Sequence, residues 1–353
     1  MKRVLFTIPV VGGGMGRAVI NFAAEFSRLG FEVAIFLLAD SKIEQYKTIE
    51  NIEVISGIRG KYVKYKFLGS LLKLRHVCKQ RGFNYVFSFS GMHSSYVIMA
   101  LTGIASKVFV FHRASPYKTY GKINDVLNSI LFLRSSGLVV QTQTAKDIFR
   151  KKYKHSNIIL VPNPVKEVLI NNNQERENIV ISISRLIKGK GLDILIKMFS
   201  DICRQGNEKW RLQIVGEGDY RKTLESHIKK CGMEDRIELV GFQCDVDHYL
   251  SKASIFAFTS ESEGFPNALL EAMCSGLPCI SFDCPTGPSE MIIDGENGFL
   301  VRMNDIDTYR KKLELLMNNQ EIREKFSGEA IRLSGKYNSC AIIQNFIMEL
   351  EKC

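Results

Sequence analysis

The stretch Thr259–Glu271 reads T-S-E-S-E-G-F-P-N-A-L-L-E, and the rest of the chain can be organised around it. The apolar run 253–258 before it predicts a buried strand. The small residues 268–276 after it predict a helix that ends near Gly276 and Pro278. Pro266 suits the first helical position, because the N–H that proline lacks would be unpaired there. The sequence therefore predicts a strand, a loop and a helix N-terminus in succession.

Two carboxylates bracket this predicted helix start. The free amides of a first helical turn favour an anion. Glu263 lies in the loop before the helix, and Glu271 lies five residues beyond Pro266, about 7 Å along the helix axis at 1.5 Å per residue. Phosphates at a helix N-terminus, with carboxylates that accept from sugar hydroxyls, are typical of a nucleotide-sugar site.

Three motifs in order carry a resemblance to a known family. The segment Glu263–Glu271 resembles the E-x7-E motif of the GT-B, family 4-type retaining glycosyltransferases, and the match continues to Pro278. Ser184–Gly191 (S-R-L-I-K-G-K-G) and Asp294–Val301 (D-G-E-N-G-F-L-V) fit the same family. Cys284–Glu290 resembles the bacterial subgroup that transfers sugars onto envelope polysaccharides or lipid-linked glycans, although a Pro/Gly turn alone would explain it. The resemblance implies an α/β fold in which two Rossmann-like domains face a central cleft and a C-terminal helix crosses back to the N-terminal domain.

The pattern of apolar runs predicts the same division from the residues alone. Near-continuous apolar runs alternate with helical patterns through the first part of the chain, as in a parallel sheet, and the alternation restarts near residue 179. A length of 353 residues also favours two domains. We expect an acceptor-binding domain over residues 1–165, joined by a last helix at 337–353, and a nucleotide-sugar-binding domain over residues 166–336. The polar segment 171–178 is the expected hinge.

The resemblance assigns roles in the second domain. Arg185 and Lys190 would neutralise the diphosphate of the leaving nucleotide, Glu263 would act beside the sugar, and Glu271 would hold the ribose hydroxyls. The other predicted donor-binding residues are Gly13, Gly14, Gly216, Phe242, Phe265, Pro266, Asn267 and Ala268.

The glycines at 12–16 predict a tight loop between a strand and a helix. They do not form the dinucleotide-binding fingerprint, because Arg17 stands where that pattern requires glycine. A flexible turn that needs positive φ angles would explain the same residues.

Residues of the first domain complete the predicted site. His112 and Arg113 end an apolar run, at the sheet edge where ligands bind in open α/β folds. The resemblance places a cleft residue, often histidine, at position 112, near the sugar and the acceptor, so we expect a catalytic role for His112. From its position beside His112 we expect Arg113 to meet an acceptor phosphate, and His93 is a further candidate acceptor residue. A buried structural histidine remains an alternative for His112.

The net charge of +11 is unevenly distributed. Residues 1–165 carry 24 Lys/Arg against 8 Asp/Glu, whereas the rest carry 24 against 29, and no acidic residue lies between Glu53 and Asp125. In the segment 59–81, basic residues interleave with tyrosine, phenylalanine and leucine. This predicts docking on an anionic membrane surface, with an acidic ligand or an ordinary solvated face as alternatives. No recognition motif for nucleic acid accompanies the charge.

The sequence predicts no metal and no cofactor beyond the nucleotide-sugar co-substrate. Asp245-Val246-Asp247 matches the metal-binding D-x-D pattern of another glycosyltransferase fold, but it opens a predicted helix, where the helix dipole explains acidic residues. The nine cysteines are scattered and give no zinc or disulfide pattern. No uninterrupted apolar run is long enough for a transmembrane helix, so we expect a cytoplasmic protein, peripheral on the inner face of the cell membrane.

The expected activity is transfer of a hexose or N-acetylhexosamine from a nucleoside-diphosphate sugar, UDP being favoured, to a membrane-associated glycan acceptor. The resemblance implies retention of the anomeric configuration and no metal requirement. The alternatives are a hydrolysing nucleotide-sugar 2-epimerase of the same fold and a catalytically silent nucleotide-sugar-binding subunit.

Overall fold

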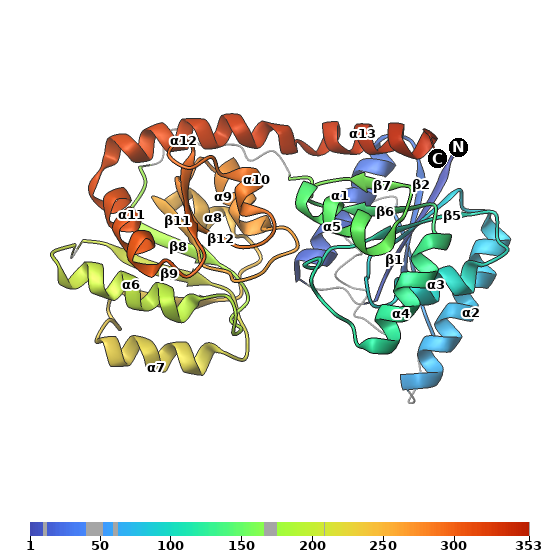
Figure 1. The fold of residues 1–353 in the computed structure, drawn as a ribbon, viewed down its shortest axis with the longest axis horizontal. Helices are drawn as coiled ribbons and strands as arrows, with labels where there is room; N and C mark the ends of the chain where they lie inside the picture. Colours follow the sequence, from blue (N-terminus) through green and yellow to red (C-terminus); the bar gives the residue numbers. More distant parts are fainter. Residues whose placement is uncertain (10–12, 40–51, 59–62, 166–174, 208, 353) are drawn as a thin grey trace. The chain divides into compact units, whose positions relative to one another are not determined.

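The chain forms two compact units, Met1–Lys166 together with Tyr337–Cys353, and Glu167–Lys336. We describe them from a computed structural model that covers residues 1–353 except 10–12, 40–51, 59–62, 166–174, 208 and 353 (Figure 1). Residues 171–174 of the predicted hinge at 171–178 lie outside the described residues. No helix among the described residues is both long and apolar enough to cross a membrane.

The first unit is built on a seven-stranded parallel sheet of order β3-β2-β1-β4-β5-β6-β7. Its strands are β1 (Arg3–Ile8), β2 (Glu32–Leu37), β3 (Glu53–Ser56), β4 (Tyr85–Ser88), β5 (Lys107–Phe111), β6 (Gly137–Val140) and β7 (Ile158–Leu160). The helices of this unit are α1 (Gly13–Arg28), α2 (Val63–Arg81), α3 (Ser94–Leu101), α4 (Lys122–Leu131) with the 3₁₀ turn η2 (Phe132–Arg134), α5 (Gln143–Tyr153) and α13 (Ser339–Lys352). The 3₁₀ turn η3 (Gly335–Tyr337) spans the boundary between the two units in the sequence.

The last helix, α13, completes the core of this first unit. Phe346 of α13 contacts the rings of Phe26 on α1, Phe87 on β4 and Phe111 on β5, with centroid separations of 5.5–6.2 Å. Burial of large aromatic side chains is the main stabilising term at such a contact. The prediction that the C-terminal helix returns to the N-terminal domain is therefore confirmed.

The second unit is built on a six-stranded parallel sheet of order β10-β9-β8-β11-β12-β13. Its strands are β8 (Ile179–Ile183), β9 (Arg211–Val215), β10 (Ile237–Gly241), β11 (Ile255–Phe258), β12 (Cys279–Asp283) and β13 (Gly298–Arg302). Its helices are α6 (Leu192–Arg204), α7 (Arg221–Cys231), α8 (Asp247–Lys252), α9 (Asn267–Cys274), α10 (Pro288–Met291), α11 (Ile306–Asn318) and α12 (Gln320–Ser334).

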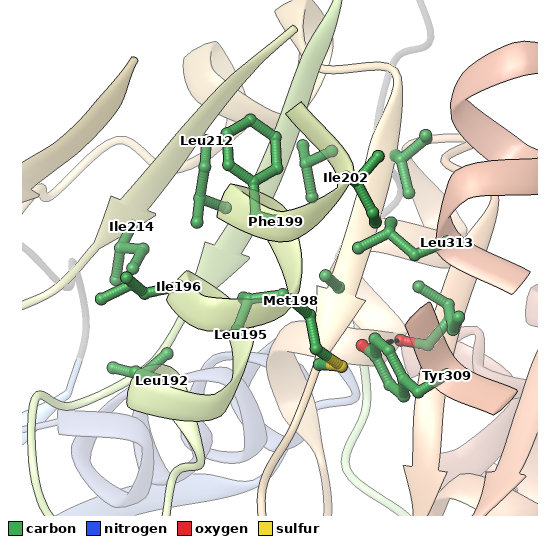
Figure 2. Close-up of a cluster of buried hydrophobic side chains, with 14 of the residues drawn as sticks. Leu192, Leu195, Ile196, Met198, Phe199, Ile202, Leu212, Ile214, Tyr309 and Leu313 are labelled. Atoms are coloured by element: carbon green, nitrogen blue, oxygen red, sulfur yellow. Dashed lines mark hydrogen bonds between the residues drawn. The ribbon is translucent and has the colours of Figure 1, made fainter. Parts of the chain in front are cut away.

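A buried cluster between α6, β9 and α11 holds the second sheet in place (Figure 2). Leu195 and Phe199 of α6 are fully buried there, at the spacing of one helical face. Tyr309 of α11 is also fully buried, and its hydroxyl donates to the carbonyl oxygens of Phe258 (3.3 Å) and Ile280 (3.1 Å). This side chain thus connects β11 and β12 just before the loops that carry the predicted site.

Both sheets share one strand order. Counted within each unit, the order is 3-2-1-4-5-6, the doubly wound arrangement, with β7 added at one edge of the first sheet. In such sheets the chain reverses its winding between the first and fourth strands, and ligands bind beside the carboxyl ends of the strands at that point. The reversal falls between β1 and β4 in the first unit and between β8 and β11 in the second. The predicted α/β class with two Rossmann-like domains is confirmed.

The structure corrects several predicted boundaries. Gly13–Gly16 belong to the first turn of α1 and do not form a loop, while Gly12 lies outside the described residues. Pro266 is the N-cap of α9 (φ −82°, ψ 75°), so the helix begins one residue later than predicted, at Asn267. The short strands β3, β7 and β13 were not predicted from the sequence.

Candidate functional site

The loops that follow β8 and β11 meet at the switch point of the second sheet. Nζ of Lys190, from the first loop, lies 2.5 Å from Oε1 of Glu263, from the second loop. The two side chains are 12% and 16% exposed, so this ion pair is largely shielded from water. The two residues come together because β8 and β11 are neighbouring parallel strands, whose carboxyl ends share one edge of the sheet.

Backbone contacts fix the two loops against each other. The Thr259 hydroxyl donates to the carbonyl oxygen of Lys190 (2.8 Å), and the Glu261 amide donates to that of Gly189 (3.0 Å). Gly191 has a φ of +63°, and a Cβ there would overlap the Thr259 carbonyl oxygen. The close approach that positions Lys190 therefore requires glycine at this position.

A third loop, after β12, supports Glu263 from its backbone side. The Thr286 hydroxyl donates to the Glu263 carbonyl oxygen, and Gly287 (φ +106°) leaves room for Pro266, which a Cβ would overlap. Sequence reasoning missed Thr286, because its segment is also explained by a Pro/Gly turn. Cys284 is buried in the same loop, and that burial raises the pKa of its thiol to about 12.

The N-terminus of α9 lies directly after this loop. Phe265 is buried, whereas Asn267 and Ala268 are half-buried. Glu271 follows on the same helix, is half-buried, and accepts from the Ser275 amide and hydroxyl at its carbonyl oxygen. The first-turn amides of α9 and the positive end of its helix dipole lie at the same edge of the sheet as Lys190.

Three further predicted residues lie around the same edge. Arg185, after β8, is exposed, and its guanidinium makes no ion pair or hydrogen bond to the described residues. Gly216, after β9, has a φ of +145°, and a Cβ there would overlap the Ser184 carbonyl oxygen. Phe242, after β10, is 70% exposed. The glycine is thus required for packing, while the arginine and the aromatic ring are open to a ligand.

In the first unit, His112 follows β5 and is buried. Its ring packs edge-on against Phe149 (4.6 Å between centroids), and Nε2 lies 3.4 Å from the Tyr120 hydroxyl. Burial, and to a lesser extent the positive charge of Lys152, lower the pKa of His112 to about 3. The imidazole is therefore neutral at physiological pH and can exchange hydrogen bonds without carrying charge. Tyr120 was not foreseen, because it lies in an irregular segment.

The guanidinium of the next residue, Arg113, is buried among aromatic rings. Its guanidinium lies 5.0–5.2 Å from the ring centroids of Phe22, Phe89 and Phe111. With the Gln141 amide oriented to accept from Nη1 (3.1 Å), the buried Nε and Nη2 still lack a hydrogen-bond partner. Burial lowers the pKa of Arg113 to about 9. Buried donors without partners are rare, and they point to a group that binds there.

A pocket of about 460 Å³ lies beside these residues in the first unit. His93 lies in its wall, with Nδ1 2.9 Å from the Ser90 hydroxyl, and burial lowers the pKa of His93. The residues that line the pocket are Ser90, Gly91, Met92, His93, Arg113, Ala114, Lys118, Thr119 and Tyr120. The structure thus brings the two predicted acceptor residues to one pocket. Gly13 and Gly14 open α1, beyond β1.

Two family matches adjoin each other along the chain. Residues 12–167 match Glycosyltransferase Family 4, and residues 166–333 match Glycosyl transferases group 1. An uncharacterized glycosyltransferase of Haemophilus influenzae is 28% identical over 351 residues, which cover 98% of this chain and 99% of the relative. The N-acetylgalactosamine-N,N'-diacetylbacillosaminyl-diphospho-undecaprenol 4-alpha-N-acetylgalactosaminyltransferase of Campylobacter jejuni is 25% identical over 94% of both chains.

Solved structures share the whole fold. HepE of Anabaena in complex with UDP-glucose superposes with a TM-score of 0.87 at 17% identity, over 100% of both chains. TarM of S. aureus in complex with UDP, alpha-GlcNAc-glycerol and fondaparinux gives a TM-score of 0.85 at 15% identity, over 99% of both chains. With adjoining family matches across residues 12–333 and full-length neighbours in fold, the chain belongs to the GT-B glycosyltransferases, in family 4.

Proposed function

We propose that this glycosyltransferase transfers a hexose or N-acetylhexosamine from a nucleoside-diphosphate sugar, with UDP as the nucleotide, to a membrane-associated glycan acceptor, with retention of the anomeric configuration. The observation that carries the proposal is the shielded ion pair between Lys190 and Glu263 at the start of α9. This pair places a cation for a diphosphate and a carboxylate for sugar hydroxyls at one point of the sheet edge.

The relatives support the donor and the acceptor class. Two of the solved structures of the same fold contain UDP or UDP-glucose. The name of the Campylobacter relative specifies a diphospho-undecaprenol acceptor, and another relative is a lipopolysaccharide 1,6-galactosyltransferase of Salmonella typhimurium. We accordingly place the reaction in the synthesis of cell-surface polysaccharide or lipid-linked glycan, at the cytoplasmic face of an anionic membrane. The described part of the predicted basic segment, α2, would lie toward that membrane.

In the proposed mechanism the donor diphosphate binds at the N-terminus of α9. Lys190 and the exposed Arg185 stabilise the charge that develops on the leaving phosphate, and such preorganised electrostatics usually dominate catalysis. Glu271 holds the ribose hydroxyls, and Phe242 stacks on the base. Because two cations and a helix N-terminus already neutralise the diphosphate, the proposed transfer needs no metal ion.

Glu263 has a second part in this mechanism. Before the donor binds, its carboxylate pairs with Lys190, and a diphosphate would compete for the same ammonium group. The carboxylate that is released then accepts hydrogen bonds from the sugar. The leaving phosphate takes the proton of the acceptor hydroxyl as the new glycosidic bond forms on the same face of the sugar. Neutral His112 would orient a sugar or acceptor hydroxyl without adding charge.

On the acceptor side, Arg113 and His93 are proposed to contact the acceptor from the pocket of the first unit. A phosphate of a lipid-linked acceptor would supply the partner that Nε and Nη2 of Arg113 lack. Arginine suits this role, since its planar fork binds phosphate through two parallel hydrogen bonds.

The test is thermal unfolding with UDP, GDP or ADP, each with and without EDTA. A ligand that binds only the folded state raises Tm by mass action. We expect UDP alone to raise Tm, in EDTA as well, and Glu271→Ala to abolish the shift. Glu234→Ala, at an exposed position between α7 and β10, is the control and should keep the shift. A rise in Tm that appears only when metal is present would contradict the proposed site. So would the absence of a rise with all three nucleotides.

A further inference from the structure

Helix α4 exposes an apolar stripe and buries an amide. Beside Leu131, its buried side carries Asn128, whose Oδ1 accepts from the Ser95 hydroxyl (2.5 Å) and whose Nδ2 donates to the Gly91 carbonyl oxygen (2.9 Å). Asn128 is 1% exposed, so one of the most buried side chains of this helix is an amide. A helix on the surface of a globular domain normally turns its apolar stripe inward.

The preceding turn of α4 repeats this arrangement. Oδ1 of Asn124 accepts from the Tyr96 hydroxyl (2.9 Å), and its Nδ2 donates to the Tyr120 carbonyl oxygen (3.0 Å). Oδ1 of Asp125 accepts from the Tyr120 amide (3.1 Å). Specific hydrogen bonds therefore fix the rotation of α4 about its axis, and they hold Asn124 and Asn128 toward the protein.

The apolar side of the same helix faces outward. Ile123, Val126, Ile130 and Leu133 are 77%, 58%, 53% and 54% exposed. They recur at i, i+3, i+7 and i+10, which is one stripe of a helix that continues into η2. This spacing places the four side chains next to one another, so they are not singly scattered surface residues. A contiguous exposed apolar surface marks an interaction site.

The neighbouring helices extend this surface. Helix α3 contacts both α2 and α4, so the three helices form one layer of the first unit (Figure 1). Leu68 and Leu72 on α2 and Met99 on α3 are also exposed, at 51–62% of their surface. We call the exposed apolar side chains of this layer the α2–α4 face, which comprises Leu68, Leu72, Met92, Met99, Ile123, Val126, Ile130 and Leu133.

The charges around this face are of one sign. Between Glu53 and Asp147 the sequence holds a single acidic residue, Asp125, and its carboxylate is turned inward to the Tyr120 amide. Exposed Lys122 and Arg134 stand at the two ends of the apolar stripe of α4. A second copy of this chain would bring two positive surfaces together, whereas an anionic surface with an apolar interior matches both the charge and the apolar stripe.

We propose that α4 is the element that inserts into the membrane, and that the α2–α4 face docks on a bilayer that contains anionic lipids. The apolar stripe enters the boundary between headgroups and acyl chains, while Lys122 and Arg134 contact the headgroups. The inference rests on the proposed function in one respect, that the acceptor is carried by a membrane.

This assignment revises the one made from the sequence, which placed docking on the segment 59–81. Within α2, Leu71, Leu74 and Val77 pack into the core. Leu68 and Leu72 remain exposed, so part of the predicted stripe of α2 can still contact a membrane. Cations of α2 also bind within the protein. Lys73 donates to the Ser56 carbonyl oxygen, Arg75 to those of Ala100 and Thr102, and Arg81 pairs with Glu53. Residues 59–62 lie outside the described residues.

The test is flotation of the full chain with vesicles of phosphatidylcholine alone or with about one third phosphatidylglycerol. We expect binding to the anionic vesicles only, and at least a tenfold loss in the double variant Ile123→Ser/Ile130→Ser. The matched control is Leu315→Ser/Ile331→Ser, which removes two exposed apolar side chains from α11 and α12 and should bind as the wild type does. Lys122→Glu/Arg134→Glu should lower binding at low salt.

A second measurement does not depend on the loss of binding. The chain has one tryptophan, Trp210, which is buried in the second unit. Val126→Trp adds a reporter on α4, and its fluorescence should shift to shorter wavelength when anionic vesicles are added. Leu315→Trp should not shift. An unchanged spectrum of Val126→Trp on vesicle-bound protein would overturn the insertion of α4.

The remaining outcomes are decisive as well. Equal vesicle binding by wild type and Ile123→Ser/Ile130→Ser, or equal binding to neutral and anionic vesicles, would overturn the inference. The inference would also be overturned if the wild type were a dimer that does not bind vesicles and Ile123→Ser/Ile130→Ser were a monomer. The UDP-induced rise in Tm, measured on the same variants, separates this inference from the proposed function. Loss of vesicle binding with an intact UDP shift supports the docking surface, whereas absence of the UDP shift in the wild type counts only against the proposed function.

Discussion

Nζ of Lys190 lies 2.5 Å from Oε1 of Glu263, across a gap of 73 residues in the sequence. Each residue belongs to a loop that follows one of the two strands at the switch point of the second sheet. The pair is shielded enough for its attraction to exceed that of an exposed ion pair. In the donor-free protein each charge therefore neutralises the other, and in the proposed mechanism a diphosphate competes with the carboxylate for the ammonium group.

Replacement of Lys190 by alanine tests the cationic half of this pair. We expect Lys190→Ala to lower transfer by about 10²–10³-fold, the usual effect of removing one preorganised charge or donor from a transition state. UDP binding should weaken as well, measured by calorimetry. The matched control is Lys188→Ala, which removes an exposed lysine of the same loop. If both variants lose activity equally, transfer depends on the total charge of this loop and Lys190 has no specific role.

Replacement of Glu263 by glutamine should act on UDP binding in the opposite direction. The amide keeps the size of the carboxylate and removes the charge that competes with the diphosphate for Lys190. We therefore expect UDP to bind Glu263→Gln as tightly as the wild type or more tightly, while sugar transfer falls. Calorimetry with UDP and an initial-rate assay measure the two effects. Weaker UDP binding by this variant would contradict the proposed exchange of partners.

Substitution of Gly216 tests the packing of the loop that follows β9. Gly216 has a φ of +145°, and a Cβ there would overlap the Ser184 carbonyl oxygen. We expect Gly216→Ala to lower Tm by several degrees and to reduce the UDP-induced shift. Gly232→Ala is the control, since Gly232 also has a positive φ (+62°) but nothing lies within 4 Å of its added Cβ. That variant should lose only the cost of the left-handed backbone, about 1 kcal/mol.

Much of this fold could be predicted from the sequence, because burial on both faces leaves a clear pattern. Strands such as Arg3–Ile8 and Ile179–Ile183 are almost entirely apolar, and the order of strand, loop and helix then places each motif at one sheet edge. The short β3 escaped prediction because only part of it is buried, and β7 because it has three residues.

The candidate site could be predicted only as a set of residues near one another. Sequence spacing indicated that Lys190 and Glu263 lie at the same edge, but their direct pairing depends on loop contacts, among them that of Thr286. The sequence could not predict which side of α4 faces the protein. Periodicity predicted a helix over residues 122–134, yet periodicity does not reveal which side faces the protein. Hydrogen bonds made by Asn124 and Asn128 decide that, and their partners are distant in the sequence.

Arg113 should affect acceptor use and stability in opposite directions. Its buried Nε and Nη2 lack partners, so Arg113→Met removes an uncompensated charge while it keeps contact with the phenylalanine rings. We expect an unchanged or higher Tm, an unchanged UDP shift, and at least a tenfold rise in KM for a phosphate-bearing acceptor. Arg150→Met, at an exposed position on α5, is the control. Wild-type acceptor kinetics in Arg113→Met would rule out its proposed contact.

The buried imidazole of His112 should make the protein less stable in acid. Its pKa is lowered from 6.5 to about 3, chiefly by burial, so the unfolded chain binds a proton in this window that the folded chain does not. The stability contributed by neutral His112 is complete above pH 6.5 and falls as the pH drops toward 3, by up to about 1.4 kcal/mol per pH unit. Denaturant unfolding at several pH values should therefore show a shallower acid slope for His112→Gln than for the wild type. The control is His76→Gln, at an exposed position on α2, and it should keep the wild-type slope. Equal slopes for His112→Gln and the wild type would mean that His112 is protonated in the folded protein, and its proposed role as a neutral hydrogen-bonding group would then fail.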